Sequence, residues 1–354
     1  MRATSWMRGL CALMGVFGYL VLPHVSQAAA EFWNLATDFR VFPHQRNPNP
    51  DSIGNPDVWH FMESSSLVHD PGTYALLPEF ISDRESIQGL EGWQSAIDCT
   101  VDDKLPFVGI NATGTLQRYL TITLPAGVVV AHPCFDQLAI VGWRSPIDGT
   151  VTIRSKFTDV DDVCGNGIAW SIEHGSRSIT QGEITNGGSQ ALDLKSIDVT
   201  QGSFLYFIID PKDGDHSCDS TGLDLTITTR ELANSLVSFQ PLRTTFRTTP
   251  DTAGCPVDSV AKFFFEARWT NTSTQSLSSG LVQVAEITSD DQLLRLLTET
   301  GLITRGGAFP VPGIGAYADG VLSPQEAVDV QFVVCLKTLQ SFQLFVDVLA
   351  QVVR

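Results

Sequence analysis

The sequence predicts an all-β protein made of two β-sandwiches, and two observations carry this prediction. Apolar and polar residues alternate in many short runs, for example in residues 168–173 and 223–228. A period of two is typical of half-buried strands. Turn-forming residues separate the runs at short intervals, as in residues 165–167 and 211–214. Short strands at this spacing favour a sandwich or barrel over a parallel α/β sheet.

Residues 1–30 are predicted to be a secretory signal peptide. Arg2 and Arg8 give the positive start, residues 10–22 are apolar, and residues 26–30 offer small-residue cleavage sites. The apolar stretch is too short to span a membrane comfortably, and no later segment has the length and apolarity of a span. We therefore expect an exported chain, secreted or at the cell surface, with the periplasm and a retained N-terminal anchor as alternatives.

Residues 31–230 are predicted to form the larger sandwich. Their first part is irregular, with many turn formers in residues 45–56 and short strands in residues 57–62 and 120–124. From residue 138 onward the strands become regular. Residues 204–209 are apolar throughout, as expected for a strand covered on both faces.

Residues 231–354 are predicted to form the second, smaller sandwich. Alternation is clear in residues 261–269, 328–336 and 342–348. The leucine-rich residues 290–298 fit either a short helix or an extension of the sheet.

Several motifs of the chain are familiar. In the first unit they are residues 138–149, 159–161, 165–170, 181–184, 210–211 and 219–223; in the second they are residues 269–271, 322–326 and 345–349. The first unit resembles the jelly-roll domains of secreted bacterial proteins, of the carbohydrate-binding-module or galactose-binding-like type. The second resembles the small immunoglobulin-like sandwiches appended to such proteins. The resemblance implies this order of folds, and it implies sugar binding by analogy of fold.

The charge composition of the chain disfavours some classes of binding partner. The 354 residues include 22 Lys plus Arg and 39 Asp plus Glu, for a net charge of −17. Phosphate binding needs a basic surface, so nucleic acid and anionic membranes are disfavoured as partners. The simplest interpretation of the charge is a soluble acidic protein.

The cysteines predict disulfides. Of the 7 cysteines, Cys11 falls in the predicted signal peptide, and export brings the others to an oxidising compartment. Spacing along the chain favours the pairs Cys99–Cys134, Cys164–Cys218 and Cys255–Cys335 among several possible connectivities. A zinc site is disfavoured, because Cys-x-x-Cys and closely spaced histidine pairs are missing from the sequence.

Two acidic loops are candidates for a structural calcium site. If Cys164 and Cys218 pair, the loops around them meet and bring together several of the hard oxygen ligands that calcium prefers. The candidate ligands are Asp159, Asp161, Asp162, Asp213, Asp215 and Asp219. The alternative is a set of turn aspartates, solvated or hydrogen-bonded to the backbone. The sequence contains no full calcium loop of the helix–loop–helix type.

Tryptophans are the candidates for glycan binding, because an exposed indole can stack on a sugar ring. Trp143 and Trp170 lie in regular strands and are expected in the core. Trp59 and Trp93 lie in the irregular region and are the predicted ligand contacts.

The sequence indicates a binding protein and not an enzyme. It has no nucleophile elbow, no zinc-protease motif and no phosphate loop. We predict an exported, non-catalytic module that recognises extracellular glycans. One alternative is a structural or adhesion protein that binds a cell-surface protein at a free sheet edge. The other is a glycoside hydrolase whose carboxylate pair the sequence does not single out.

Overall fold

The computed structural model describes residues 31–39, 46–84, 87–101, 103–113, 115–288, 295–298 and 301–353. The predicted signal peptide, residues 1–30, lies outside the described residues. Among the described residues, no helix has the length and apolarity needed to cross a membrane.

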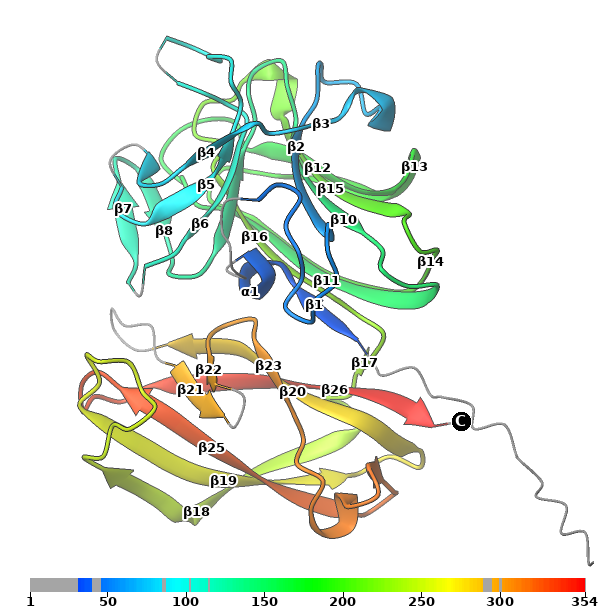
Figure 1. The fold of residues 1–354 in the computed structure, drawn as a ribbon, viewed down its shortest axis with the longest axis vertical. Coiled ribbons are helices and arrows are strands. Elements are labelled where there is room, and N and C mark those ends of the chain that lie inside the picture. The colour runs from blue at the N-terminus through cyan, green and yellow to red at the C-terminus, as the bar shows by residue number, and fades with distance from the viewer. Residues whose placement is uncertain are drawn as a thin grey trace, which may run out of the picture.

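The first unit is a sandwich of two antiparallel sheets (Figure 1). The larger sheet has the order β14 (Ser189–Val199), β11 (Gly149–Asp159), β16 (Thr221–Thr228), β9 (Val129–His132), β6 (Phe107–Asn111), β5 (Leu90–Gln94) and β4 (Glu79–Ile81), with β1 (Phe32–Asn34) pairing β16. The other sheet has the order β13 (Arg177–Ile184), β12 (Ile168–His174), β15 (Phe204–Pro211), β10 (Ala139–Arg144), β2 (Trp59–Glu63) and β3 (Ala75–Leu76). Smaller elements are helix α1 (Leu35–Phe39), the 3-10 turns η1 (Pro71–Thr73) and η3 (Lys212–Gly214), and the ribbon β7 (Gln117–Tyr119) with β8 (Ile122–Leu124).

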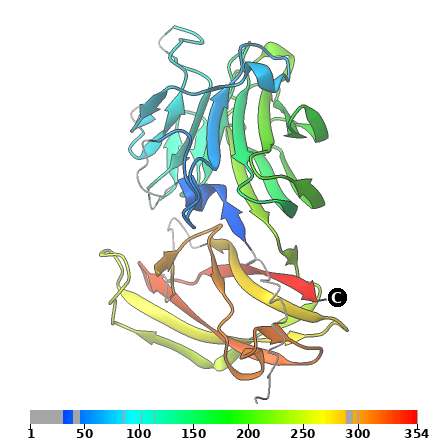
Figure 2. The same ribbon diagram turned by 45° about the vertical axis from the view of Figure 1, so that its right-hand side comes forward.

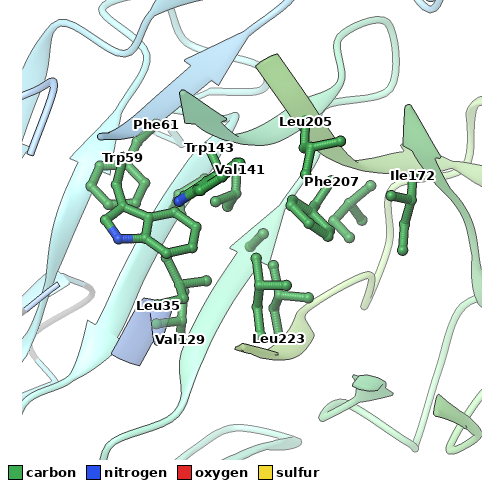
Figure 3. Packing of buried hydrophobic residues seen from close by; sticks show 14 of the residues in the cluster. Leu35, Trp59, Phe61, Val129, Val141, Trp143, Ile172, Leu205, Phe207 and Leu223 are labelled. Carbon is green, nitrogen blue, oxygen red and sulfur yellow. The ribbon is translucent and has the colours of Figure 1, made fainter. Parts of the chain in front are cut away.

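The core of this sandwich follows from strand alternation. Alternate residues of β10 and β15, among them Val141, Trp143 and Phe207, point to the opposite sheet and are buried. Figure 3 shows these side chains meeting residues of the other sheet, including Leu223 of β16. The predictions that Trp143 and Trp170 are core residues are confirmed.

The second unit is also a sandwich. One sheet has the order β18 (Val237–Thr249), β19 (Ala261–Asn271), β25 (Ala327–Leu336), β21 (Arg295–Thr298) and β22 (Gly301–Ile303). The other has the order β17 (Glu231–Leu232), β26 (Gln343–Val353), β20 (Ser276–Thr288) and β23 (Ala308–Pro310), with β24 (Val321–Leu322) also pairing β20 and the turn η4 (Gly315–Tyr317) beside it. Within the ambiguous segment 290–298, residues 295–298 extend a sheet, and the others lie outside the described residues.

These sheets confirm the predicted fold class, an all-β chain with a jelly-roll-like sandwich followed by a smaller immunoglobulin-like sandwich. The two sandwiches stack end to end, with β1 and α1 on the side of the first that faces the second (Figure 2). Polar contacts join them. Arg154 pairs with Asp347 at 2.6 Å, and Arg305 pairs with Asp224 at 2.6 Å.

Three disulfides form, and they are the pairs favoured by spacing: Cys99–Cys134, Cys164–Cys218 and Cys255–Cys335. The first two hold loops of the first sandwich, and the third ties the loop before β19 to β25. Three such bridges are typical of a protein that folds in an oxidising compartment.

Candidate functional site

Trp59 and Trp93 do not lie at a ligand-accessible surface. Trp59 is 0% exposed and Trp93 is 8% exposed. The expectation that these rings face a ligand was therefore wrong. The reason is that β2 and β5 belong to the two sheets of the sandwich, so their alternate residues point into its core.

The polar edge of Trp59 is also satisfied inside the protein. Its indole N–H donates to Asp38 Oδ2 at 2.8 Å, and the Ser52 N–H donates to Asp38 Oδ1 at 3.0 Å. Burial raises the pKa of Asp38 to about 7. Asp51 holds the indole of Trp33 in the same way, at 2.8 Å. The sequence carries no spacing signal for these contacts, which join α1 and its following loop to the core.

The disulfide Cys164–Cys218 brings the two acidic loops together, as expected. A carboxylate oxygen of Asp161 lies within 4.8 Å of both sulfur atoms. Gly165 has a φ of +84°, and a Cβ placed there would lie 2.2 Å from the carbonyl oxygen of Ser217. The loops therefore touch, and only glycine fits at that position.

The carboxylate of Asp159 accepts hydrogen bonds from backbone N–H groups. It is buried, and its Oδ1 accepts from the Asp161 N–H at 2.9 Å while its Oδ2 accepts from the Gly187 N–H at 2.8 Å. This is the turn-aspartate role that was the alternative to metal binding.

Asp219 and Asp161 are different, because their carboxylates are buried without full hydrogen bonding. Asp219 is 1% exposed, and neither of its carboxylate oxygens has a hydrogen-bond partner among the described residues. Asp161 is 4% exposed, and its Oδ1 is likewise unpaired there. Burial, followed by the charges of Asp215 and Asp159, raises the pKa of Asp219 to about 8. Unpaired buried carboxylates are costly, and a hard cation would offset that cost.

The remaining candidate ligands lie at the rim of this cluster. Asp162, Asp213 and Asp215 are exposed, and Asp215 accepts a hydrogen bond from the Ser217 N–H at 3.1 Å. Asp161 and Asp219 are thus buried and the other three aspartates exposed, and the group of ligand atoms within 4.8 Å of one another is Asp161 with the two cysteines, without Asp219.

A row of aromatic rings runs across the outer face of the sheet β13–β12–β15–β10–β2–β3. His60 of β2 meets Phe204 of β15 edge to face, with ring centroids 4.9 Å apart. Phe204 stacks on Tyr206 at 5.3 Å, and Tyr74, from the segment before β3, meets Tyr206 at 5.1 Å. His60 and Phe204 are half-buried, whereas Tyr206 is covered. The open part of the row is therefore at His60 and Phe204.

A polar cluster lies at the covered end of the row. His69 Nδ1 lies 2.6 Å from Glu173 Oε1, and His69 Nε2 lies 3.4 Å from Asp210 Oδ2. Ser171 donates to Glu173 at 3.1 Å. The hydrogen bond to Asp210, followed by the interactions with Glu173, raises the pKa of His69 against the effect of burial. The contacts of His69 with Glu173 and Asp210 join residues more than a hundred positions apart, so no local sequence pattern predicts them.

The chemistry open to this cluster is limited by its own hydrogen bonds. Ser171 is 2% exposed and its hydroxyl already donates to Glu173. Both nitrogens of His69 face carboxylates, and its Nδ1 also lies 3.3 Å from the Ser171 hydroxyl oxygen. The cluster instead fastens the segment that carries His69 and Tyr74 onto the sheet.

His69 should make stability depend on pH in a defined direction. Its folded-state pKa is raised, so the stabilisation from the bridged imidazolium is complete below the unfolded-state pKa and is lost as pH rises through the folded-state pKa. We expect the gap in Tm between the wild type and His69→Gln to be largest near about pH 5 and to shrink towards about pH 8. Thermal unfolding of both proteins at each pH measures this, and a gap that does not change with pH would contradict it.

Comparison with known proteins gives little family information. No protein-family model and no curated protein matches the chain. Among solved structures, Paenibacillus xanthan lyase matches with 10% identity and a TM-score of 0.24, over 69% of this chain and 26% of that one. Bacteroides uniformis β-glucuronidase 2 matches with 10% identity and a TM-score of 0.21, over 61% and 25%. Amycolatopsis orientalis exo-chitosanase CsxA matches with 9% identity and a TM-score of 0.23, over 56% and 20%.

The matches cover about a quarter or less of each of these enzymes. Likeness at these identities and TM-scores says nothing about what this chain binds.

Proposed function

We propose that this protein is an exported, non-catalytic binding module that recognises a glycan on the outer face of its first sandwich. One observation carries the proposal: the aromatic row is open to solvent at the half-buried Phe204, on the same sheet face as the partly exposed carboxylate of Asp210. A sugar offers an apolar C–H face to an aromatic ring and hydroxyl groups to nearby acceptors. An apolar surface with a few placed polar groups is the usual composition of a small-ligand site.

The charges select among glycans. The polar groups beside the row are the partly exposed carboxylate of Asp210 and, opposite Phe204 on β10, the exposed guanidinium of Arg144; the whole chain has a net charge of −17. Carboxylates accept hydrogen bonds from hydroxyl groups and repel acidic sugars. The net charge of the chain therefore favours a neutral glycan over an acidic one.

Phe204 is the residue whose removal should report on this site. We expect Phe204→Ala to weaken glycan binding by at least about tenfold, because loss of stacking and buried apolar area on this scale costs about 1.4 kcal/mol. A glycan array identifies the ligand, and calorimetric titration of the wild type and the variant measures the change.

The matched control is Phe135→Ala, which removes a phenylalanine that is 43% exposed and lies elsewhere on the first sandwich. It should bind like the wild type. An array without a hit, or equal binding by both variants, would overturn the glycan site. Hydrolysis of the bound glycan would contradict the non-catalytic assignment and support the glycosidase alternative.

We also propose that a structural calcium ion lies between the loops joined by Cys164–Cys218. Asp219 would be its carboxylate ligand, and backbone carbonyls and water would complete an oxygen shell. The buried, unpaired carboxylate of Asp219 supports this assignment. Its role would be to order the loops at one end of the first sandwich.

A further inference from the structure

The second sandwich has an apolar groove between its sheets, which we call the β18–β26 groove. Its volume is about 600 Å³. Six of the residues that line it are Phe239, Phe246, Phe263, Phe265, Leu344 and Val346. Its lining includes no charged side chain. The groove is open to solvent, since Phe239 is 41% exposed and Phe246 is 45% exposed.

The groove exists because the two sheets differ in extent. β18 is a long strand at the edge of its sheet, and Phe239 and Phe246 pack on inward-facing aromatics of that sheet. In the facing sheet, the strand next to β26 is β17, which pairs only with Leu349 and Ala350. In the described part of the chain, no strand pairs with Gln343–Asp347 on that edge. The position opposite β18 therefore has no strand.

Among the described residues, the backbone groups of β26 that point to this position have no strand partner. The Val348 carbonyl accepts from the Ala233 N–H at 2.7 Å, and the Val348 N–H donates to Asn234 Oδ1 at 2.7 Å. Val348 thus directs both backbone groups towards the β17 side. Residues of one strand alternate in direction, so Leu344 and Val346 direct their N–H and C=O groups to the same side. Their side chains line the groove.

We propose that the β18–β26 groove binds an extended segment of another protein, which adds as a strand to Leu344–Val346 and inserts alternate apolar side chains between the sheets. Strand addition of this kind gives affinity through main-chain hydrogen bonds and specificity through pockets for alternate side chains. The new strand would continue the line of β17 along β26. This site is independent of the glycan site, because it lies on the other sandwich.

The lining of the groove defines the kind of segment that would bind there. Arg243 and Arg247 of β18 are exposed, and neither has a carboxylate partner among the described residues. Neither arginine lines the groove, and the guanidinium of Arg247 packs over the ring of Phe264 on the outer face of the sheet. The segment that fits the uncharged lining is one with apolar residues at alternate positions.

The test uses the full mature chain with its disulfides intact and a labelled synthetic peptide. In this peptide valine and leucine alternate with threonine and serine. We expect saturable binding by fluorescence polarisation. Binding should fall by at least about tenfold for a shuffled peptide of equal composition and for one N-methylated at the amides that face β26, because these changes remove the alternation and the main-chain donors.

Two protein variants locate the site. Phe246→Glu places a charge in the groove and should weaken peptide binding by at least about tenfold. Phe345→Glu is the matched control, because Phe345 is 51% exposed and points to the opposite face of β26; it should leave binding within about twofold. Both positions are exposed, so both variants should fold.

Hydrogen exchange gives a second readout. The amides of Leu344 and Val346 should become protected when the peptide binds, whereas the Phe345 amide, directed to β20, should not change. Absence of peptide binding, or equal binding of the shuffled and N-methylated peptides, would overturn the proposal. So would self-association of the protein that Phe246→Glu abolishes, because the occupant would then be a second copy of this chain.

Discussion

Replacement of Trp59 by alanine is expected to lower the free energy of unfolding by about 3–5 kcal/mol. The side chain is fully buried between the sheets, so its loss removes a large apolar surface and leaves a cavity. The change also leaves the buried Asp38 carboxylate without its indole donor. Urea unfolding of the disulfide-bonded chain measures the difference through the shift of the transition midpoint at constant slope.

Two further variants separate the apolar and polar parts of this effect. Trp59→Phe keeps much of the ring but removes the N–H donor, and it should cost about 1–3 kcal/mol through the unpaired Asp38 oxygen. Phe345→Ala serves as a control for removal of an aromatic ring, and because that ring is 51% exposed its effect should be small. If Trp59→Ala abolished glycan binding while stability stayed unchanged, the indole would be a ligand contact after all.

The sequence was sufficient for features that depend on local pattern. Alternation at Ile168, Trp170 and Ile172 places these residues on one face of a strand whatever the strand pairs with, and all three are core residues. Proximity along the chain favoured the pair Cys164–Cys218 among several possible connectivities, and this disulfide forms. Trp59 shares its parity with Phe61, so its burial was also visible in the pattern. The apolar Met62 on the other face and the surrounding turn formers obscured it.

Features that depend on strand order were not accessible in this way. His69 meets Glu173 only because the segment before β3 crosses the outer face of β12 and β15. The β18–β26 groove exists because β17 ends after two residues while β18 extends for thirteen. No residue type or spacing in either strand specifies which strand of the other sheet it will face. Such sites arise from the difference in extent between two sheets, which local alternation does not encode.

Calcium should stabilise the wild-type protein, and Asp219→Asn should remove that response. An ion that binds only the folded state at about a hundred times its Kd contributes about 2.7 kcal/mol to stability. The measurement is thermal unfolding with calcium and with chelator. Asp213→Asn is the matched control, because it removes an exposed carboxylate near the same disulfide and should keep the full response.

The sign of the Asp219→Asn effect distinguishes calcium from a loss of structure. With chelator, the wild type retains a buried carboxylate that has no hydrogen-bond partner among the described residues. Asparagine removes its charge with little change in shape, so without calcium the variant should be at least as stable as the wild type. With calcium, the order should reverse, because only the wild type gains the ion. A variant that is less stable by the same amount under both conditions would show that Asp219 supports the loops without a metal.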